Sequence, residues 1–219
     1  MEQRLARERE QHQREQVEAE LVTEKLQQQM SAVQMMALQA QLNPHFLFNS
    51  LNSLSSLIAD QPAQAERFVD ELSSVYRYLL RTNDHDLTTL QTELAFIDSY
   101  YHLLKTRYGA GIDLTKAIDE PFLHYKIPPL TLQLLLENAV KHNIVSSDQP
   151  LVIQFATSPD GWLTVSNTLQ RKPVNRVNST QKGLLNILYK YQLLGQSAPK
   201  VEETIDAFMV TLPLIKPTV

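Results

Sequence analysis

The spacing of apolar residues predicts that the N-terminal part of the chain is a long helix. From Leu26 to Ile58, apolar residues recur at alternating intervals of four and three, with polar residues between them. This heptad spacing is typical of a coiled-coil seam, and one apolar stripe on a long helix needs a partner helix to cover it. We therefore expect a homodimer. The seam consists of Leu26, Met30, Val33, Ala37, Ala40, Pro44, Leu47, Leu51, Leu54 and Ile58.

Two further helices are predicted after this seam. Pro62 ends the first helix, because the residue before a proline avoids the helical region. Apolar positions at intervals of three and four then predict a helix over 63–81 and another from residue 87 or 88 to about Tyr108. Thr88 or Thr89 begins a possible capping box for the latter helix. The first two helices form a hairpin, and two hairpins can dimerise into a four-helix bundle.

The second half of the chain mixes strand and helix patterns. Alternating apolar and polar residues predict strands, and proline at a helix start is favourable because its missing N–H has no intrahelical partner there. The expected order is strand, helix, two strands, helix, strand, which predicts an α+β sandwich of one sheet covered by helices on one face. The expected strands are 111–118, 151–157, 162–167 and 207–212, and the expected helices are 127–142 and 183–194.

Composition excludes several classes of protein. The chain has 219 residues, is 43% apolar and carries a net charge of −4, which predicts a packed core and gives no basic footprint for nucleic acid. It has no cysteine, which excludes disulfides and cysteine-ligated metals. No apolar run reaches about 18 residues, and the charged N-terminus is unlike a signal peptide. We therefore expect no nucleic-acid partner and no membrane span within the sequence given.

His45 is the first candidate for chemistry. Pro44 removes an N–H and bends a helix where His45 is placed. Asn43 and Asn49 flank it, and Asn49 lies one helical turn further on, where it can orient the imidazole. A neutral imidazole nitrogen is a competent nucleophile near pH 7. The alternative is an ordinary packing histidine in a helical bundle.

A second candidate site interrupts the apolar helix predicted over 127–142. Glu137, Asn138, Lys141, His142 and Asn143 lie within two turns at its end. Oxygen ligands beside a cation are what a magnesium–phosphate site needs. The alternative is an ordinary helix C-terminus, where Lys141 and His142 favour the helix dipole. That alternative does not explain Glu137 and Asn138.

Together the two stretches resemble a known family. QLNPHFLFN, residues 41–49, resembles the phosphoacceptor box of LytS-type sensor histidine kinases. LENAVKH, residues 136–142, resembles their N box, and IPPL at 127–130 and Gln133 precede it as in the family. The resemblance covers roughly 38–212. It implies a dimerisation and phosphotransfer hairpin over 41–84, and a connecting helix with a GHKL-type ATP-binding domain over 85–219. The heptad pattern adds a coiled-coil signalling helix over 1–40.

The resemblance also implies roles for individual residues. His45 corresponds to the phosphorylated residue, with Asn49 beside it, and Asn138 corresponds to the Mg²⁺ ligand that bridges the ATP phosphates. Lys141 and His142 correspond to residues that face the phosphates. Phe46 follows His45 where many histidine kinases have an acid. We therefore expect that Glu137 or a phosphate oxygen acts as the base, or that a neutral His45 needs none.

The remaining nucleotide boxes depart from the family pattern. Asn167 stands where the family has an aspartate that binds the adenine amine, and it offers a neutral acceptor where a charged one would bind more strongly. Gly183 is the one glycine left in a box that is usually glycine-rich; it presents N–H groups to phosphate, or it is simply a helix junction. Loop 169–181 corresponds to an ATP lid whose cations face phosphates or are solvated. The expected nucleotide-binding set is Asn138, Lys141, His142, Asn167, Gly183, Leu184 and Asn186.

These features predict the transmitter of a two-component system, with ATP and Mg²⁺ as cofactors. The partners expected are a second copy of the chain, a response regulator, and an upstream sensor or membrane domain absent from this sequence. The expected location is the cytoplasmic side of a bacterial inner membrane. One alternative is a catalytically degenerate dimeric scaffold that relays signals by interaction. A weaker one is a chaperone-like GHKL protein that hydrolyses ATP.

Overall fold

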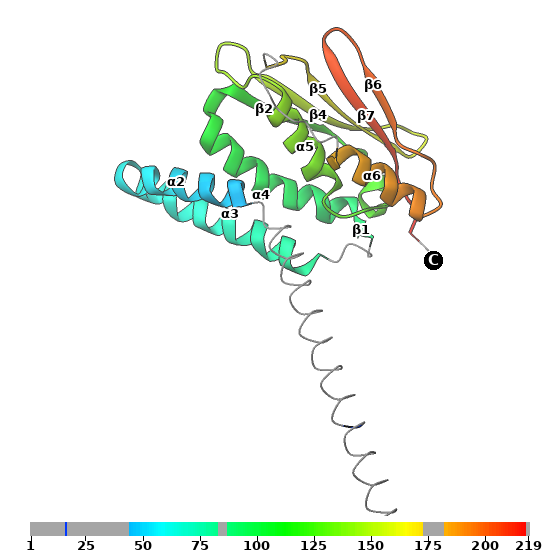
Figure 1. Ribbon diagram of the computed structural model, residues 1–219, viewed down its shortest axis with the longest axis horizontal. Helices are drawn as coiled ribbons and strands as arrows, with labels where there is room; N and C mark the ends of the chain where they lie inside the picture. The colour runs from blue at the N-terminus through cyan, green and yellow to red at the C-terminus, as the bar shows by residue number, and fades with distance from the viewer. Residues whose placement is uncertain (1–15, 17–43, 83–86, 173–181, 218–219) are drawn as a thin grey trace, which may run out of the picture. The chain divides into compact units, whose positions relative to one another are not determined.

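The computed structural model describes residues 16, 44–82, 87–172 and 182–217 (Figure 1). The chain divides into two compact units, Met1–Asn49 and Ser50–Val219. The predicted coiled coil over 1–40, the seam before Pro44 and the loop that holds Arg176 lie outside the described residues. The domain boundaries drawn from the sequence stay predictions.

The first two described helices follow the predicted hairpin pattern. Helix α2 (Pro44–Asp60) and helix α3 (Pro62–Arg81) are separated by Gln61 alone. The Gln61 N–H donates to the Leu57 carbonyl at 2.7 Å, which completes the last turn of α2. Pro62 occupies the start of α3, where it needs no N–H partner. The apolar stripe of α3 is buried through Ala65, Phe68, Leu72, Val75 and Leu79.

Helix α4 (Leu90–Tyr108) lies between the hairpin helix α3 and the rest of the second unit (Figure 1). Thr89 caps it, because the Thr89 hydroxyl oxygen accepts the Thr92 N–H at 3.1 Å, which confirms the predicted cap. Tyr100 is buried on this helix and Tyr101 is half-buried. Since neighbours lie on two sides, the buried set is wider than one stripe: Leu90, Glu93, Leu94, Phe96, Ile97, Tyr100, Leu103 and Leu104.

A five-stranded sheet forms the second layer. Its strand order is β2-β4-β5-β7-β6, with β2 parallel to β4 and every other pair antiparallel. Alternate residues of β4 and β5 are buried, as their sequence predicts. Strand β6 was not predicted, because all four of its residues are exposed at the sheet edge and show no alternation. The strands are β2 (Ile112–Ala117), β4 (Leu151–Thr157), β5 (Trp162–Thr168), β6 (Lys200–Glu203) and β7 (Ala207–Pro213).

The helix predicted from residue 127 begins later. Ile127 belongs to strand β3 (Lys126–Ile127), which pairs with β1 (Thr88–Thr89). Leu130 then adopts a left-handed conformation with φ 63°, and helix α5 (Thr131–His142) starts after it. Helix α6 (Lys182–Leu193) is the last described helix. Two short 3-10 helices, η1 (Gly109–Gly111) and η2 (Glu120–His124), flank β2.

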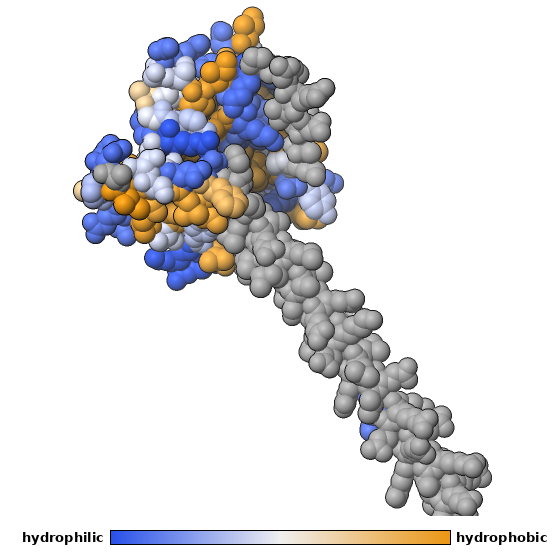
Figure 2. All heavy atoms as spheres, turned by 60° about the vertical axis from the view of Figure 1, so that its left-hand side comes forward, coloured by the Kyte–Doolittle hydropathy of each residue, from blue (hydrophilic) through white to orange (hydrophobic). Residues whose placement is uncertain are grey.

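Helices α4, α5 and α6 lie on one side of the sheet, which confirms the predicted α+β architecture (Figure 1). The core between the layers includes Leu132, Leu136, Ile153 and Phe155, all fully buried. Apolar side chains are also exposed over the hairpin (Figure 2), where Leu51, Ile58, Val69 and Leu80 are between 42% and 60% exposed. Within the described part of the chain, we find no helix both long and apolar enough to cross a membrane.

Candidate functional site

Helix α5 holds the predicted polar cluster at its C-terminal half. The helix packs on the sheet through buried residues such as Leu132 and Leu136. Glu137 and Asn138 follow directly and are half-buried, whereas Lys141 and His142 are exposed. The polar cluster therefore lies at the surface, at the C-terminal end of α5.

Asn138 lies beside the start of α6. A Cβ atom placed on Gly183 would lie 3.7 Å from Asn138 Oδ1, 3.8 Å from Asn138 Nδ2 and 3.8 Å from the Leu134 side chain. Two residues predicted from separate motifs are therefore neighbours. Among the described residues, the Asn138 side chain has no hydrogen-bond partner, so its amide oxygen is available to a ligand.

The N-terminus of α6 adds backbone donors to this place. Gly183 and Leu184 lie in the first turn of the helix, where N–H groups have no intrahelical acceptor. Such N–H groups, with the positive end of the helix dipole, favour an anion. Asn186 is exposed one turn further on, and no described contact joins it to Asn138. The phosphate-binding roles of Gly183, Leu184 and Asn186 stay predictions.

Glu137 is held from α4 and from its own helix. The buried Tyr100 hydroxyl donates to Glu137 Oε1 at 2.9 Å, and Gln133 Nε2 donates to the same oxygen at 2.9 Å. Burial raises the pKa of Tyr100 well above its ordinary value, and the nearby Glu137 carboxylate raises it further. The Tyr100 hydroxyl is therefore hydrogen-bonded inside the protein, on a side chain that is 3% exposed.

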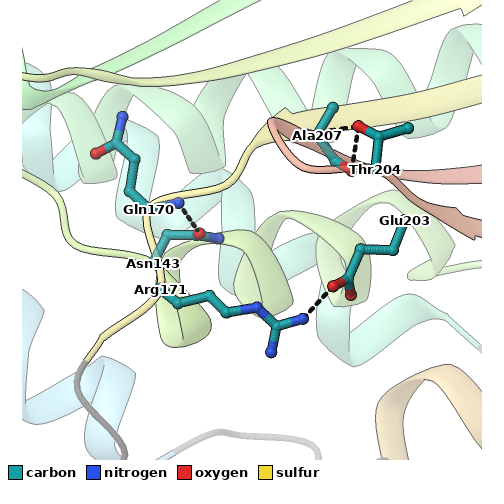
Figure 3. A network of polar contacts seen from close by, with 6 residues as sticks. All are labelled: Asn143, Gln170, Arg171, Glu203, Thr204 and Ala207. Atoms are coloured by element: carbon teal, nitrogen blue, oxygen red, sulfur yellow. Dashed lines mark hydrogen bonds and ion pairs between the residues drawn. The ribbon is translucent and has the colours of Figure 1, made fainter.

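The segment after β5 is tied to the end of α5 (Figure 3). Asn143 is 2% exposed, and its Nδ2 donates to the Ala139 carbonyl at 2.8 Å. Its Oδ1 accepts the Gln170 N–H at 2.7 Å, and the Ile144 N–H donates to the Gln170 carbonyl at 2.7 Å. The first residues of the predicted lid are therefore fixed to the polar cluster. The sequence analysis included Asn143 in this cluster but did not predict that its side chain joins α5 to the segment after β5.

Two cations in the same segment have definite partners. Lys172 Nζ donates to the Val140 and Lys141 carbonyls at 3.0 and 3.1 Å, at the negative end of the α5 dipole. Arg171 forms an ion pair with Glu203 of β6 (Figure 3). Both side chains are exposed, so the alternative that these charges are solvated agrees with the structure. Partial burial, with Lys141, Lys172 and Arg171 nearby, lowers the pKa of His142 below its ordinary value.

Asn167 lies on β5, paired in register with Ile153 and Phe208. It is 8% exposed, and its Nδ2 donates to the Thr168 carbonyl at 2.7 Å. Because the amide nitrogen is engaged, the carbonyl oxygen is the group left to accept a hydrogen bond. The predicted contact with adenine stays a prediction.

His45 is the second residue of α2, and its side chain lies outside the described residues. Asn49 lies one turn further along the same helix and is half-buried. Both belong to the first compact unit, whereas the α5 cluster belongs to the second. Their predicted roles in phosphotransfer stay predictions.

A buried carboxylate that sequence reasoning missed lies beside α5. Glu93 of α4 is 0% exposed, and its Oε2 accepts the Tyr78 hydroxyl at 2.8 Å and the Leu130 N–H at 3.2 Å. Burial raises the pKa of Glu93 to about 7. The signal in the sequence is an acid three residues after Leu90 and one before Leu94, inside an apolar stripe.

Comparison with known proteins supports the two motifs. The histidine kinase family matches residues 33–112. The sensor histidine kinase YpdA of Escherichia coli K12 is 31% identical over 171 residues, and the sensor protein LytS of Streptococcus agalactiae is 34% identical over 174 residues. These alignments cover 73% and 72% of this chain. Over these residues the chain is similar to LytS-type sensor histidine kinases.

The match spans 30% of YpdA and 29% of LytS, so the chain corresponds to less than a third of these curated relatives. Among solved structures, a blue-light activated histidine kinase of Erythrobacter litoralis covers 80% of this chain and 63% of its own length at 21% identity, with a TM-score of 0.39. Structural overlap at this level says nothing about function.

The chemistry of the residues around Asn138 and Gly183 is compatible with a magnesium ion bound together with a nucleotide. Among the described residues there is no group of three or more His, Asp or Glu side chains that could hold a metal ion. Mg²⁺ is usually bound by one or two protein ligands together with water and substrate phosphates. The Asn138 amide oxygen beside the α6 N-terminus would be one such ligand.

Proposed function

We propose that this chain is the transmitter part of a two-component sensor histidine kinase, an ATP:protein-histidine phosphotransferase. The carrying observation is that Asn138 and Gly183, from motifs far apart in the chain, are neighbours. An amide oxygen beside unpaired helix N–H groups suits a metal–phosphate pair. Similarity to the LytS-type sensor histidine kinases supports the same assignment.

In this proposal the γ-phosphoryl group of ATP passes to His45. A neutral ring nitrogen forms the N–P bond while the bond from the γ-phosphorus to the bridging oxygen breaks, and ADP leaves with the electron pair. The other ring nitrogen gives up its proton. The phosphoryl group then passes from His45 to an aspartate of a response regulator. The protein contributes positioning and charge neutralisation more than covalent chemistry.

The residues of the second unit divide this work. The N–H groups of Gly183 and Leu184 and the cation of Lys141 bind phosphate oxygens, and His142 faces them. Asn167 accepts a hydrogen bond from the adenine amine. Mg²⁺ held by Asn138 would supply charge neutralisation on the phosphates.

Glu137 is the proposed base for the His45 proton. Tyr100 and Gln133 both donate to Oε1, so Oε2 is left to accept a proton. Glu137→Gln should lower the rate of phosphorylation without abolishing nucleotide binding. An unchanged rate would remove Glu137 from the mechanism.

The chain should act as a homodimer attached to a sensor. The exposed apolar side chains of the hairpin, among them Leu51, Ile58 and Val69, would be covered in a four-helix bundle. The relatives are longer and are named sensor proteins, which supports an input domain outside this sequence. We place the chain on the cytoplasmic side of a bacterial inner membrane.

Incubation with radiolabelled ATP and Mg²⁺ tests the proposal. Acid-labile label should appear on the wild type and on His124→Gln, which alters an exposed histidine of η2, but not on His45→Gln. Label on His45→Gln would show that another residue is the acceptor. ATP at 100 times its dissociation constant should stabilise the wild type by about 2.7 kcal/mol, and Asn138→Ala should lose this shift. If the wild type gains neither acid-labile label nor stability from ATP, the proposed kinase function is refuted.

A further inference from the structure

Glu93 joins three helices of the second unit at one carboxylate. It is carried by α4, it accepts the Tyr78 hydroxyl of α3, and it accepts the Leu130 N–H at the start of α5. A carboxylate with no exposed surface is costly unless it is hydrogen-bonded. Among the described residues, Oε1 has no partner, so both described hydrogen bonds of the carboxylate depend on Oε2.

The start of α5 depends on this contact. Leu130 occupies the N-cap position and has no side chain that can cap the helix. Its φ of 63° is a left-handed conformation that leucine rarely adopts, and such strain persists only where the surroundings impose it. Glu93 provides the missing acceptor at this helix N-terminus, because its Oε2 accepts the Leu130 N–H. The orientation in which α5 leaves this point is therefore fixed from α4.

The second partner of Glu93, Tyr78, belongs to helix α3 of the hairpin. The Tyr78 ring stacks on Phe96 of α4 with ring centroids 4.3 Å apart, which holds its hydroxyl against Glu93. The strength of a hydrogen bond depends sharply on its geometry. A shift of α3 along α4 would strain this bond before it affected the apolar contacts around it.

We propose that Glu93 is a positioning residue through which helix α3 of the hairpin sets the orientation of α5 and hence of Asn138. This inference rests on the proposed kinase function and names how the hairpin that carries His45 regulates the same site. Asn138 lies eight residues after Leu130, about 12 Å along a rigid helix, so a change of tilt at Leu130 displaces it.

The side chains of α6 near Glu93 do not replace its hydrogen bond from Tyr78. Tyr191 of α6 faces the carboxylate, but its buried hydroxyl makes no hydrogen bond among the described residues. Lys190, on the same helix, contributes a favourable charge. Tyr78 is therefore the described side chain that donates a hydrogen bond to Glu93.

The test compares Tyr78→Phe with Tyr76→Phe in the full chain. Tyr76 lies on the same helix and its hydroxyl has no described hydrogen-bond partner, so it controls for loss of a tyrosine hydroxyl. At a temperature where every variant is folded, Tyr78→Phe should lower kcat for His45 labelling about tenfold while KM for ATP changes less than twofold. Tyr76→Phe should change neither. In a Glu93→Leu background, Tyr78→Phe should have little further effect, because the acceptor of the Tyr78 hydroxyl is then already missing.

Amide hydrogen exchange provides a readout that does not need activity. Tyr78→Phe should increase exchange in a peptide that covers 130–138, and Tyr76→Phe should not. Unchanged exchange there overturns the proposal, whether or not the wild type phosphorylates itself. Increased exchange with an unchanged kcat overturns the link to catalysis. Increased exchange in a protein that never labels His45 supports the link from α3 to α5 and refutes the kinase function separately.

Discussion

Replacement of Glu93 by Gln should change how the stability of the protein depends on pH. Glutamine keeps the size of the side chain and an oxygen that can accept the Tyr78 hydroxyl and the Leu130 N–H, but it cannot ionise. In the wild type, burial raises the pKa of Glu93 from 4.5 to about 7, although the hydrogen bonds from Tyr78 and Leu130 and the charge of Lys190 oppose the rise.

The sign follows from proton binding. Between pH 4.5 and 7 the folded protein keeps this carboxyl protonated, whereas the unfolded chain releases the proton. The stability that Glu93 contributes is therefore fully present below the unfolded pKa and is lost as the pH rises through the folded pKa. A shift of this size corresponds to about 3 kcal/mol, and between pH 5 and pH 8 the wild type should lose about 2 kcal/mol relative to Glu93→Gln.

Urea unfolding of both proteins at pH 5, 6, 7 and 8 measures this difference. Every other titrating group is common to the two proteins, so the difference between their unfolding free energies isolates Glu93. A difference that stays constant to within about 0.5 kcal/mol from pH 5 to pH 8 would refute a raised pKa. A difference that moves in the opposite direction would show that the hydrogen bonds outweigh burial and hold Glu93 charged.

Three further changes test the local structure. Thr89→Ala removes the N-cap of α4 and should lower the urea unfolding free energy by about 1 kcal/mol; no change would mean that water replaces the cap. Asn143→Ala should cost about 1–3 kcal/mol and increase hydrogen exchange at Gln170, and unchanged exchange would show that this segment is held without Asn143. Gly111→Ala should lower the melting temperature, because its Cβ would lie 3.0 Å from the Ser146 backbone; a wild-type value would mean that this backbone moves aside.

Local patterns in the sequence were sufficient for most elements of the fold. Apolar periodicity predicted α3 and α4, alternation predicted β4 and β5, and Thr89 marked the start of α4. The motifs around His45 and Asn138 indicated the family, which the relatives confirm. These features are local because a helix cap, a turn and a buried face each depend on residues within a few positions of one another.

Only the tertiary structure decided which groups meet. Periodicity predicts that a residue is buried but not what it faces, so the contact of Asn138 with Gly183 and the hydrogen bond of Tyr100 to Glu137 could not be read from the chain. Strand β6 was invisible because an exposed edge strand needs no apolar alternation. Glu93 is the clearest case: its sequence shows an acid in an apolar stripe, whereas its partners on α3 and α5 come from distant segments that packing brings to one carboxylate.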